Sequence, residues 1–237
     1  MAKIKYDDVI RSVSYDKNEL LFNILKLYNN GDTFDCDPTY SKGGFYNQSV
    51  KYPIPEPKFK FDCFPVEGID GVEKIQPFGK WSLKNKSIQS ICIDLPFVIS
   101  PVLDYNQIDK KKSIIARRFN SYYPREEMFK SYQWFMMEAY RVLKPNGICV
   151  WKTQRTISGG KCLMTPEYSW LIAEQTGFTT LDRFTLIARN RLWSGQIKEQ
   201  QHSRSFDSQF YVFRKPDGTS KTAPINYRWW EVLPFQK

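Results

Sequence analysis

A repeated alternation of helix-like and strand-like segments constrains the fold of this chain more than any other feature. Apolar residues at helical spacing predict helices over residues 17–28, 124–143 and 166–176. Apolar, strand-like runs occur at 33–36, 58–63, 88–93, 148–151, 184–188 and 209–213. The last two runs have no helix between them. Such an order favours an α/β fold, in which helices cover both faces of a mostly parallel sheet.

Residues that begin and end helices support these bounds. Asp16 is suited to cap the first helix, and Asn30-Gly31 is suited to end it. Pro145-Asn146-Gly147 is expected to end the second helix before the strand at 148–151, and Gly177 to end the third.

Length and composition indicate one globular domain over residues 1–237. The chain has 237 residues, of which 41% are hydrophobic, enough for an ordinary core. We expect the core at about 15–215, a basic irregular loop at 100–124, and a C-terminal tail at 216–237. The net charge of +10 fits a polyanionic partner such as a nucleic acid. An aromatic content of 16% supplies flat faces on which unstacked bases can lie.

The cysteines and the N-terminus indicate a compartment. The five cysteines show no paired short spacing of the zinc-binding kind, so we expect no metal site and a reducing environment. The first residues lack the apolar core of a signal peptide. No apolar run approaches the roughly 20 residues needed to cross a bilayer. We therefore expect a cytoplasmic protein that does not contact membranes.

Two polar segments follow predicted strands. Asp37-Pro38 opens a loop that runs through Thr39 to Gly43-Gly44, and Asp62 lies near the end of the next strand. A third strand, ending Ile91-Cys92-Ile93, leads directly into Asp94-Leu95-Pro96-Phe97. Because ligands of open parallel sheets bind at the carboxyl ends of strands, these segments are the candidate site.

These segments resemble class I S-adenosylmethionine-dependent DNA amino-methyltransferases, especially small phage- or prophage-type enzymes. Asp94-Leu95-Pro96-Phe97 differs at one position from their Asp-Pro-Pro-(Tyr/Phe/Trp) signature. Asp37-Pro38 matches the start of their Asp-Pro-x-x-Gly-Ser-Gly loop, whereas Ser41 and Lys42 replace its first Gly and its Ser. The turn Arg141–Gly147 and the run ending at Lys215 are also similar, so the likeness spans about residues 15–215.

The resemblance implies a three-layer α/β/α sandwich with a mostly parallel seven-stranded sheet and an antiparallel last strand at the edge of that sheet. It implies S-adenosyl-L-methionine as cofactor. The residues implied to bind this cofactor are Asp35, Asp37, Pro38, Thr39, Gly43, Gly44 and Asp62. Asp62, at the end of the second strand, would accept the ribose hydroxyls.

For the catalytic turn, the resemblance implies methylation of an exocyclic amino nitrogen in DNA. The Asp94 carboxylate and a main-chain carbonyl of the turn would accept the two N–H bonds, which localises the nitrogen lone pair. Phe97 would stack on the extruded base. Leu95 keeps the carbonyl but loses the fixed φ of a proline, and Pro96 retains part of the extended geometry.

Basic residues outside this turn are candidates for contacts with the phosphates of double-stranded DNA. They are Lys110, Lys111, Lys112, Arg117, Arg118, Arg155, Lys161 and Arg191. No separate target-recognition domain is visible, so we expect residues 100–124, 152–165 and 190–206 to choose the target. The only histidine, His202, is expected to be exposed.

Adenine N6 is the target we favour, and several alternatives remain open. The same fold is compatible with cytosine N4, RNA or a small amine as substrate. The substitutions at Leu95 and at Ser41-Lys42 also leave open a catalytically inactive binding protein. The sequence does not define a recognition site, an oligomeric state or a role in restriction and modification.

Overall fold

The computed structural model describes residues 9–46, 49–99, 122, 125–158, 160–190 and 199–218. Its helices are α1 (Lys17–Tyr28), α3 (Arg125–Val142) and α4 (Thr165–Thr176). Its strands are β1 (Val13–Ser14), β2 (Cys36–Asp37), β3 (Phe59–Asp62), β4 (Glu73–Lys74), β5 (Ile88–Asp94), β6 (Leu143–Thr153), β7 (Thr156–Ser158), β8 (Lys161–Leu163), β9 (Thr179–Ile187) and β10 (Asp207–Arg214).

One sheet organises the described residues, in the strand order β1-β9-β10-β6-β5-β2-β3-β4. The pairings of β2 with β3 and β5, of β5 with β6, and of β1 with β9 are parallel. Only β10 runs antiparallel to its neighbours, β6 and β9. The expected α/β class, with a mostly parallel sheet and an antiparallel last strand, is confirmed.

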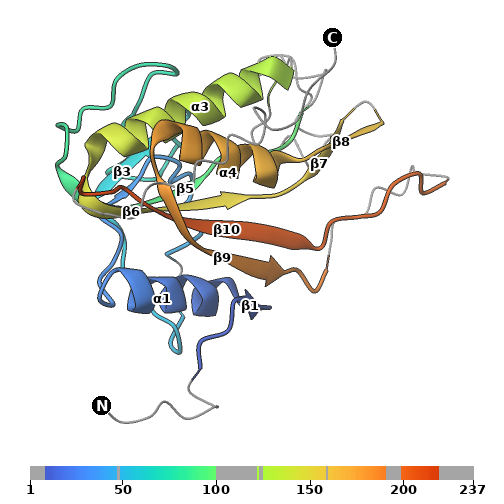
Figure 1. Cartoon of the computed structure of the whole chain (residues 1–237), viewed down its shortest axis with the longest axis horizontal. Helices are drawn as coiled ribbons and strands as arrows, with labels where there is room; N and C mark the ends of the chain where they lie inside the picture. Colours follow the sequence, from blue (N-terminus) through green and yellow to red (C-terminus); the bar gives the residue numbers. More distant parts are fainter. Residues whose placement is uncertain are drawn as a thin grey trace.

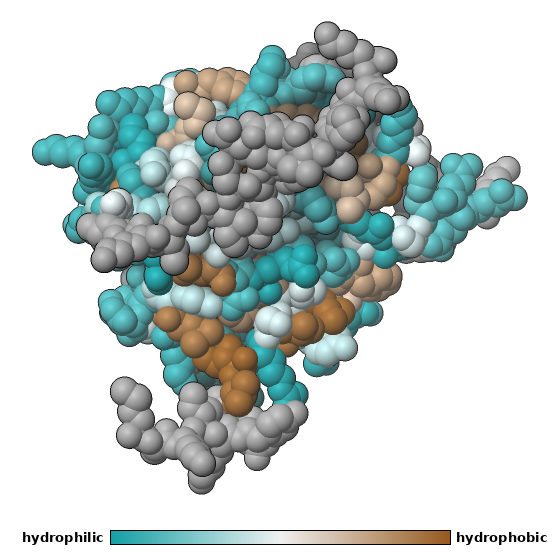
Figure 2. All heavy atoms as spheres, viewed as in Figure 1, coloured by the Kyte–Doolittle hydropathy of each residue, from teal (hydrophilic) through white to brown (hydrophobic). Residues whose placement is uncertain are grey.

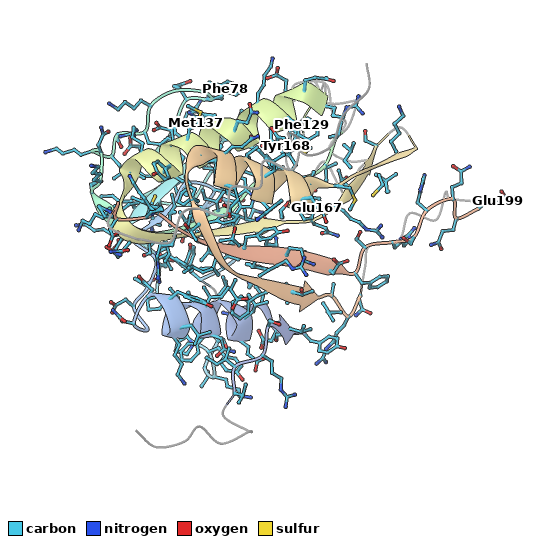
Figure 3. All side chains as sticks on the ribbon, viewed as in Figure 1. Phe78, Phe129, Met137, Glu167, Tyr168 and Glu199 are labelled. Atoms are coloured by element: carbon cyan, nitrogen blue, oxygen red, sulfur yellow. The ribbon has the colours of Figure 1, made fainter. Side chains whose placement is uncertain are left out.

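Helices cover both faces of this sheet (Figure 1). α3 and α4 lie on one face, and α1 lies on the other. The alternation of side chains along each strand explains this division, since Ile91 and Ile93 of β5 join the core under α3 and α4, whereas Cys92 joins the core under α1. Phe129 of α3 and Tyr168 of α4 meet edge to face where the two helices adjoin, with ring centroids 4.6 Å apart (Figure 3).

The ends of the helices follow the local signals in the sequence. The Asp16 carboxylate accepts hydrogen bonds from the N–H groups of Asn18 and Glu19, so it caps α1 as expected. Gly177 ends α4 with a φ of 105°, in the left-handed region that favours glycine. The buried Lys215 donates to the carbonyls of Tyr140 and Leu143, and thereby satisfies the C-terminal end of α3.

Three features of the sheet differ from the sequence expectation. The sheet has eight strands among the described residues instead of seven, and two of them, the two-residue strands β1 and β4, were not predicted from the sequence. β10 is last along the chain but lies inside the sheet, between β6 and β9. The Pro145-Asn146-Gly147 turn falls within the bounds of β6, where the pairing with β5 shifts register and Asn146 has a φ of 64°.

A β-hairpin that the sequence pattern did not indicate follows β6. β7 and β8 pair antiparallel within residues 152–165, a segment that we expected to help choose the target. The hairpin projects from the same side of the sheet as residues 199–206 (Figure 1). No described helix is long and apolar enough to cross a membrane.

Candidate functional site

The candidate site lies where the chain reverses its direction of travel across the sheet. From β2 the chain adds β3 and β4 on one side, and β5 and β6 on the other. Asp37 is the last residue of β2, and Asp94 is the last residue of β5. Since open α/β sheets bind ligands outside the carboxyl ends of strands at such a point, the topology alone selects these two segments.

The Thr39 hydroxyl connects the two segments directly. It donates to Asp37 Oδ1 at 2.9 Å and accepts the backbone N–H of Asp94 at 2.8 Å. The position of the loop after β2 therefore determines where the backbone of the Asp94 turn begins.

Asp37 is buried and serves the loop itself. Its Oδ1 accepts the Thr39 N–H and hydroxyl, and its Oδ2 accepts the Tyr46 hydroxyl at 2.9 Å. Burial, with a smaller contribution from the nearby Asp94 carboxylate, raises the pKa of Asp37 to about 7, against the effect of these three donors. Both oxygens thus face inward toward the loop.

The backbone conformation of Ser41 explains how the loop after β2 can form with a serine in place of the first glycine. Ser41 has a φ of 50°, so it adopts the left-handed conformation that its family position leaves to glycine. Its N–H donates to Asp62 Oδ2 at 2.9 Å. The loop after β2 is therefore held to the end of β3 without the glycine.

The two glycines of the loop have different surroundings. Gly43 has a φ of 68°, and a Cβ there would meet the Tyr40 hydroxyl at 2.5 Å, so the tyrosine fills the space beside it. A Cβ on Gly44 would meet nothing within 4 Å. Pro38, between Asp37 and Thr39, is buried in the same loop. Of the two glycines, Gly44 is therefore the one that offers open space to a ligand.

Asp62 lies at the end of β3, next to this loop. Besides Ser41, it accepts the Phe64 N–H on Oδ1 at 2.7 Å. Burial raises the pKa of Asp62, whereas the two backbone N–H groups lower it. Phe64 is 49% exposed and puts an aromatic side chain two residues beyond this carboxylate, a feature that sequence reasoning did not single out.

Asp35 lies apart from these residues. Its Oδ2 accepts the backbone N–H groups of Gln89 and Ser90, near the amino end of β5. This carboxylate therefore joins β2 to β5 at the end of the strand remote from Asp94.

The Asp94 turn is held from beneath by α3. Leu95 is buried at 3% exposure, and the Tyr132 hydroxyl of α3 donates to the Pro96 carbonyl at 3.2 Å. The Leu95 carbonyl accepts no hydrogen bond from the residues described, and Phe97 is half-buried. The Leu95 carbonyl is thus a main-chain acceptor next to Asp94 that no described residue occupies.

Two lysines complete the site, and sequence reasoning missed both. Lys152 of β6 forms an ion pair with Asp94, with Nζ 2.6 Å from Oδ2. Lys17, at the start of α1, donates to the Gly44 carbonyl. Both ammonium groups lie over the Phe45 ring, at 5.5 Å and 5.7 Å from its centroid. Burial lowers the pKa of Lys17, and the charge of Lys152 lowers it further.

The predicted nucleic-acid contacts are only partly described. Lys161 is exposed on β8, and the Arg155 guanidinium donates to the side chains of Ser203 and Ser205, so it joins the β7–β8 hairpin to residues 199–206. The latter segment presents hydrophilic residues where it projects from the molecule (Figure 2), with Glu199 at its outer end (Figure 3). His202 within it is exposed. The remaining predicted contacts, Lys110, Lys111, Lys112, Arg117, Arg118 and Arg191, lie outside the described residues.

In the part of the chain that the structure describes, no group of three or more His, Cys, Asp or Glu side chains is arranged to hold a metal ion.

Comparisons with known proteins find similarity at the level of structure only. No family model and no curated protein matches the chain. A "putative DNA modification methylase" of Thermus thermophilus, complexed with S-adenosyl-L-methionine, is 16% identical with a TM-score of 0.38, over 65% of this chain and 55% of that one. The cytosine-N4-specific PvuII DNA methyltransferase is 15% identical with a TM-score of 0.39, over 56% and 44%. The N-methyltransferase NodS of Bradyrhizobium japonicum is 12% identical with a TM-score of 0.40, over 82% and 93%.

The chain spans about half the length of the first two of these structures. All three TM-scores are below 0.5, so the residues of the site carry the argument for function. What the site establishes is an α/β sheet whose switch point brings together an acidic loop, a second strand-end carboxylate and an Asp-Leu-Pro-Phe turn.

Proposed function

We propose that this protein is an S-adenosylmethionine-dependent methyltransferase that modifies an exocyclic amino nitrogen of a base in DNA. Adenine N6 is the target that we favour. One observation carries the proposal. The Thr39 hydroxyl bonds the loop after β2 to the backbone of Asp94, so that a cofactor-type loop and an amine-accepting turn share one edge of the sheet.

The residues present fit the cofactor. Each oxygen of Asp62 accepts one backbone N–H, which leaves acceptor capacity on both oxygens for the two ribose hydroxyls. The open space at Gly44 lets a ligand approach the backbone of the loop. Asp37 contributes by fixing the loop, since its carboxylate already accepts three hydrogen bonds. When bound, the cofactor supplies a methyl group activated by a sulfonium.

Two acceptors at the turn are suited to an amino group. An exocyclic amine is a weak nucleophile because its lone pair is delocalised into the base. The Asp94 carboxylate and the Leu95 carbonyl would each accept one N–H, which favours a localised lone pair. The Pro96 carbonyl accepts the Tyr132 hydroxyl, whereas the Leu95 carbonyl accepts no hydrogen bond from the described residues, so we assign the second acceptor to Leu95.

DNA as the substrate is supported by charge and by the projecting segments. The chain carries a net charge of +10, which favours contact with a polyanion. The β7–β8 hairpin and residues 199–206 extend from the same side of the sheet, joined through Arg155. A base extruded from the duplex would stack on Phe97, which is half-buried beside Asp94.

The cofactor half of the proposal is tested by calorimetry. Wild-type protein is titrated with S-adenosylmethionine beside Asp62→Ala and Met137→Gln, because Met137 is 63% exposed on α3 and serves as a surface control (Figure 3). We expect binding by the wild type and the control, and binding at least about tenfold weaker by Asp62→Ala, which corresponds to the loss of about 1.4 kcal/mol. Absence of binding by the wild type at millimolar cofactor would contradict the proposal.

The substrate half is tested by transfer of a labelled methyl group. Duplex DNA, single-stranded DNA, RNA and small amines are offered separately to the wild type and to Asp94→Ala. We expect label in DNA with the wild type alone. Label only in RNA or in a small amine would replace DNA as the substrate, and cofactor binding without any transfer would favour an inactive binding protein.

A further inference from the structure

The ion pair between Lys152 and Asp94 joins two adjacent parallel strands at the candidate site. Asp94 ends β5, and Lys152 is its partner in register on β6. Lys152 Nζ lies 2.6 Å from Asp94 Oδ2, and the two side chains are only 17% and 27% exposed. An ion pair this short and this shielded from solvent restrains both side chains more than a surface pair does.

Lys152 is itself held in place from the other side of the site. Its ammonium lies 5.5 Å from the centroid of Phe45, a buried residue of the loop after β2. Lys17 approaches the same ring and donates to the adjacent Gly44 carbonyl. Lys152 therefore contacts both parts of the site, the loop and the turn.

The ion pair with Lys152 determines which oxygen of Asp94 is more available to accept a hydrogen bond from a target amine. Oδ2 accepts the Lys152 ammonium, and the backbone N–H of Asp94 is bonded to Thr39. Oδ1 accepts no hydrogen bond from the described residues, so it keeps its full acceptor capacity for an N–H from a target amine.

The ion pair of Lys152 with Asp94 is more important for fixing the turn in this chain than it would be in a chain with the family's signature. The family fixes the residue after its aspartate with a proline ring, whereas this chain has Leu95, whose φ is not fixed by a ring. A side-chain restraint on Asp94 offsets that lost backbone restraint.

We propose that Lys152 is a positioning residue, which fixes the Asp94 carboxylate so that Oδ1 faces the target amine. This inference rests on the proposed methyl transfer. It assigns to Lys152 an effect on the rate of transfer and none on the binding of the cofactor.

The test compares lysine substitutions at the two ends of β6. Lys152→Met removes the ammonium and keeps the length of the side chain, and Lys152→Arg restores the charge. Lys144→Met is the matched control, since Lys144 is exposed at the other end of the same strand. Steady-state kinetics are measured with the DNA that the wild type methylates.

We expect kcat to fall about 10- to 100-fold in Lys152→Met, the size of effect that a small misplacement of a catalytic group produces. The KM for the cofactor should stay within about twofold, and Lys152→Arg should recover at least about a third of kcat. Lys144→Met should match the wild type. Lys152→Gln, which keeps a donor without the charge, provides a second variant if Lys152→Met does not fold.

A double-mutant comparison isolates the pair. In an Asp94→Asn background, where the carboxylate is absent, Lys152→Met should change kcat by less than about twofold. A wild-type kcat in Lys152→Met, or a loss confined to the KM of the cofactor, would overturn the role of Lys152 while leaving the methyltransferase proposal intact. A wild-type protein that transfers no methyl group would overturn both.

Discussion

Thr39 accepts the backbone N–H of Asp94 at 2.8 Å through the same hydroxyl that donates to Asp37 at 2.9 Å. This oxygen is thus a direct polar contact between the loop after β2 and the turn after β5. A structural change in the loop is therefore transmitted to the backbone of the turn through this oxygen.

Removal of this hydroxyl should uncouple the two segments. Thr39→Val keeps the shape of the side chain and removes both hydrogen bonds, so the Asp94 N–H and one acceptor site of Asp37 lose a partner. We expect kcat/KM for methyl transfer to fall about tenfold and the free energy of unfolding to fall by about 1–2 kcal/mol.

Thr39→Ser is the matched control, because it retains the hydroxyl. Its kcat/KM should remain within about threefold of the wild type. A serine variant that loses as much activity as the valine variant would contradict the prediction, because serine retains the hydroxyl that makes both hydrogen bonds.

Ser41 adopts a conformation that glycine prefers, so Ser41→Gly should stabilise the protein. The left-handed conformation costs a residue with a Cβ roughly 1–2 kcal/mol, and glycine avoids this cost at the expense of about 0.5–1 kcal/mol of greater chain entropy when unfolded. We expect a net increase in the free energy of unfolding of roughly 0.5–1 kcal/mol, measured by urea denaturation.

Lys42→Gly, at the next position, serves as the comparison for Ser41→Gly. Lys42 is exposed and is not among the non-glycine residues with positive φ. Lys42→Gly should not raise the free energy of unfolding. A Ser41→Gly variant less stable than the wild type would contradict the claim that the left-handed conformation of Ser41 destabilises the protein.

The buried Asp37 should make stability depend on pH. Its pKa is about 7 in the folded protein, whereas an unfolded chain releases this proton near pH 4. Between these values the folded state holds more protons than the unfolded state, so the contribution of Asp37 to stability is greatest below about pH 4 and declines until about pH 7.

Asp37→Asn removes this titration and keeps an acceptor for Thr39. The free energy of unfolding of the variant, relative to the wild type, should therefore rise between pH 4 and pH 7, by roughly 4 kcal/mol for a shift of about three pKa units. Thermal or urea unfolding of both proteins over this range provides the measurement. If the difference in free energy of unfolding between Asp37→Asn and the wild type does not vary with pH, the prediction is refuted.

Local features of the fold could be read from the sequence. The bounds of α1 agree with the expected range of 17–28, because its apolar spacing and the Asp16 cap are properties of neighbouring residues. The strand that ends at Asp94 was predicted for the same reason, from one apolar run beside a Pro-containing turn.

Features that depend on distant pairing could not be read in this way. The pairing of Asp94 with Lys152 joins residues on separate strands, and the sequence contains no signal for the register of β5 and β6. The interior place of β10 likewise results from pairing with β6 and β9. Strands of three residues, as in the β7–β8 hairpin, are too short to show a period.

The central claim is that Asp94 directs methylation of a base amine in DNA. Its most direct test is mass-spectrometric analysis of nucleosides from the DNA of cells that express the wild type, Asp94→Ala or no protein. We predict a level of N6-methyladenine in the wild-type sample well above the levels in the Asp94→Ala sample and in the sample without the protein. N4-methylcytosine in its place would change the target base, and the absence of both modified nucleosides above the Asp94→Ala level would contradict the claim.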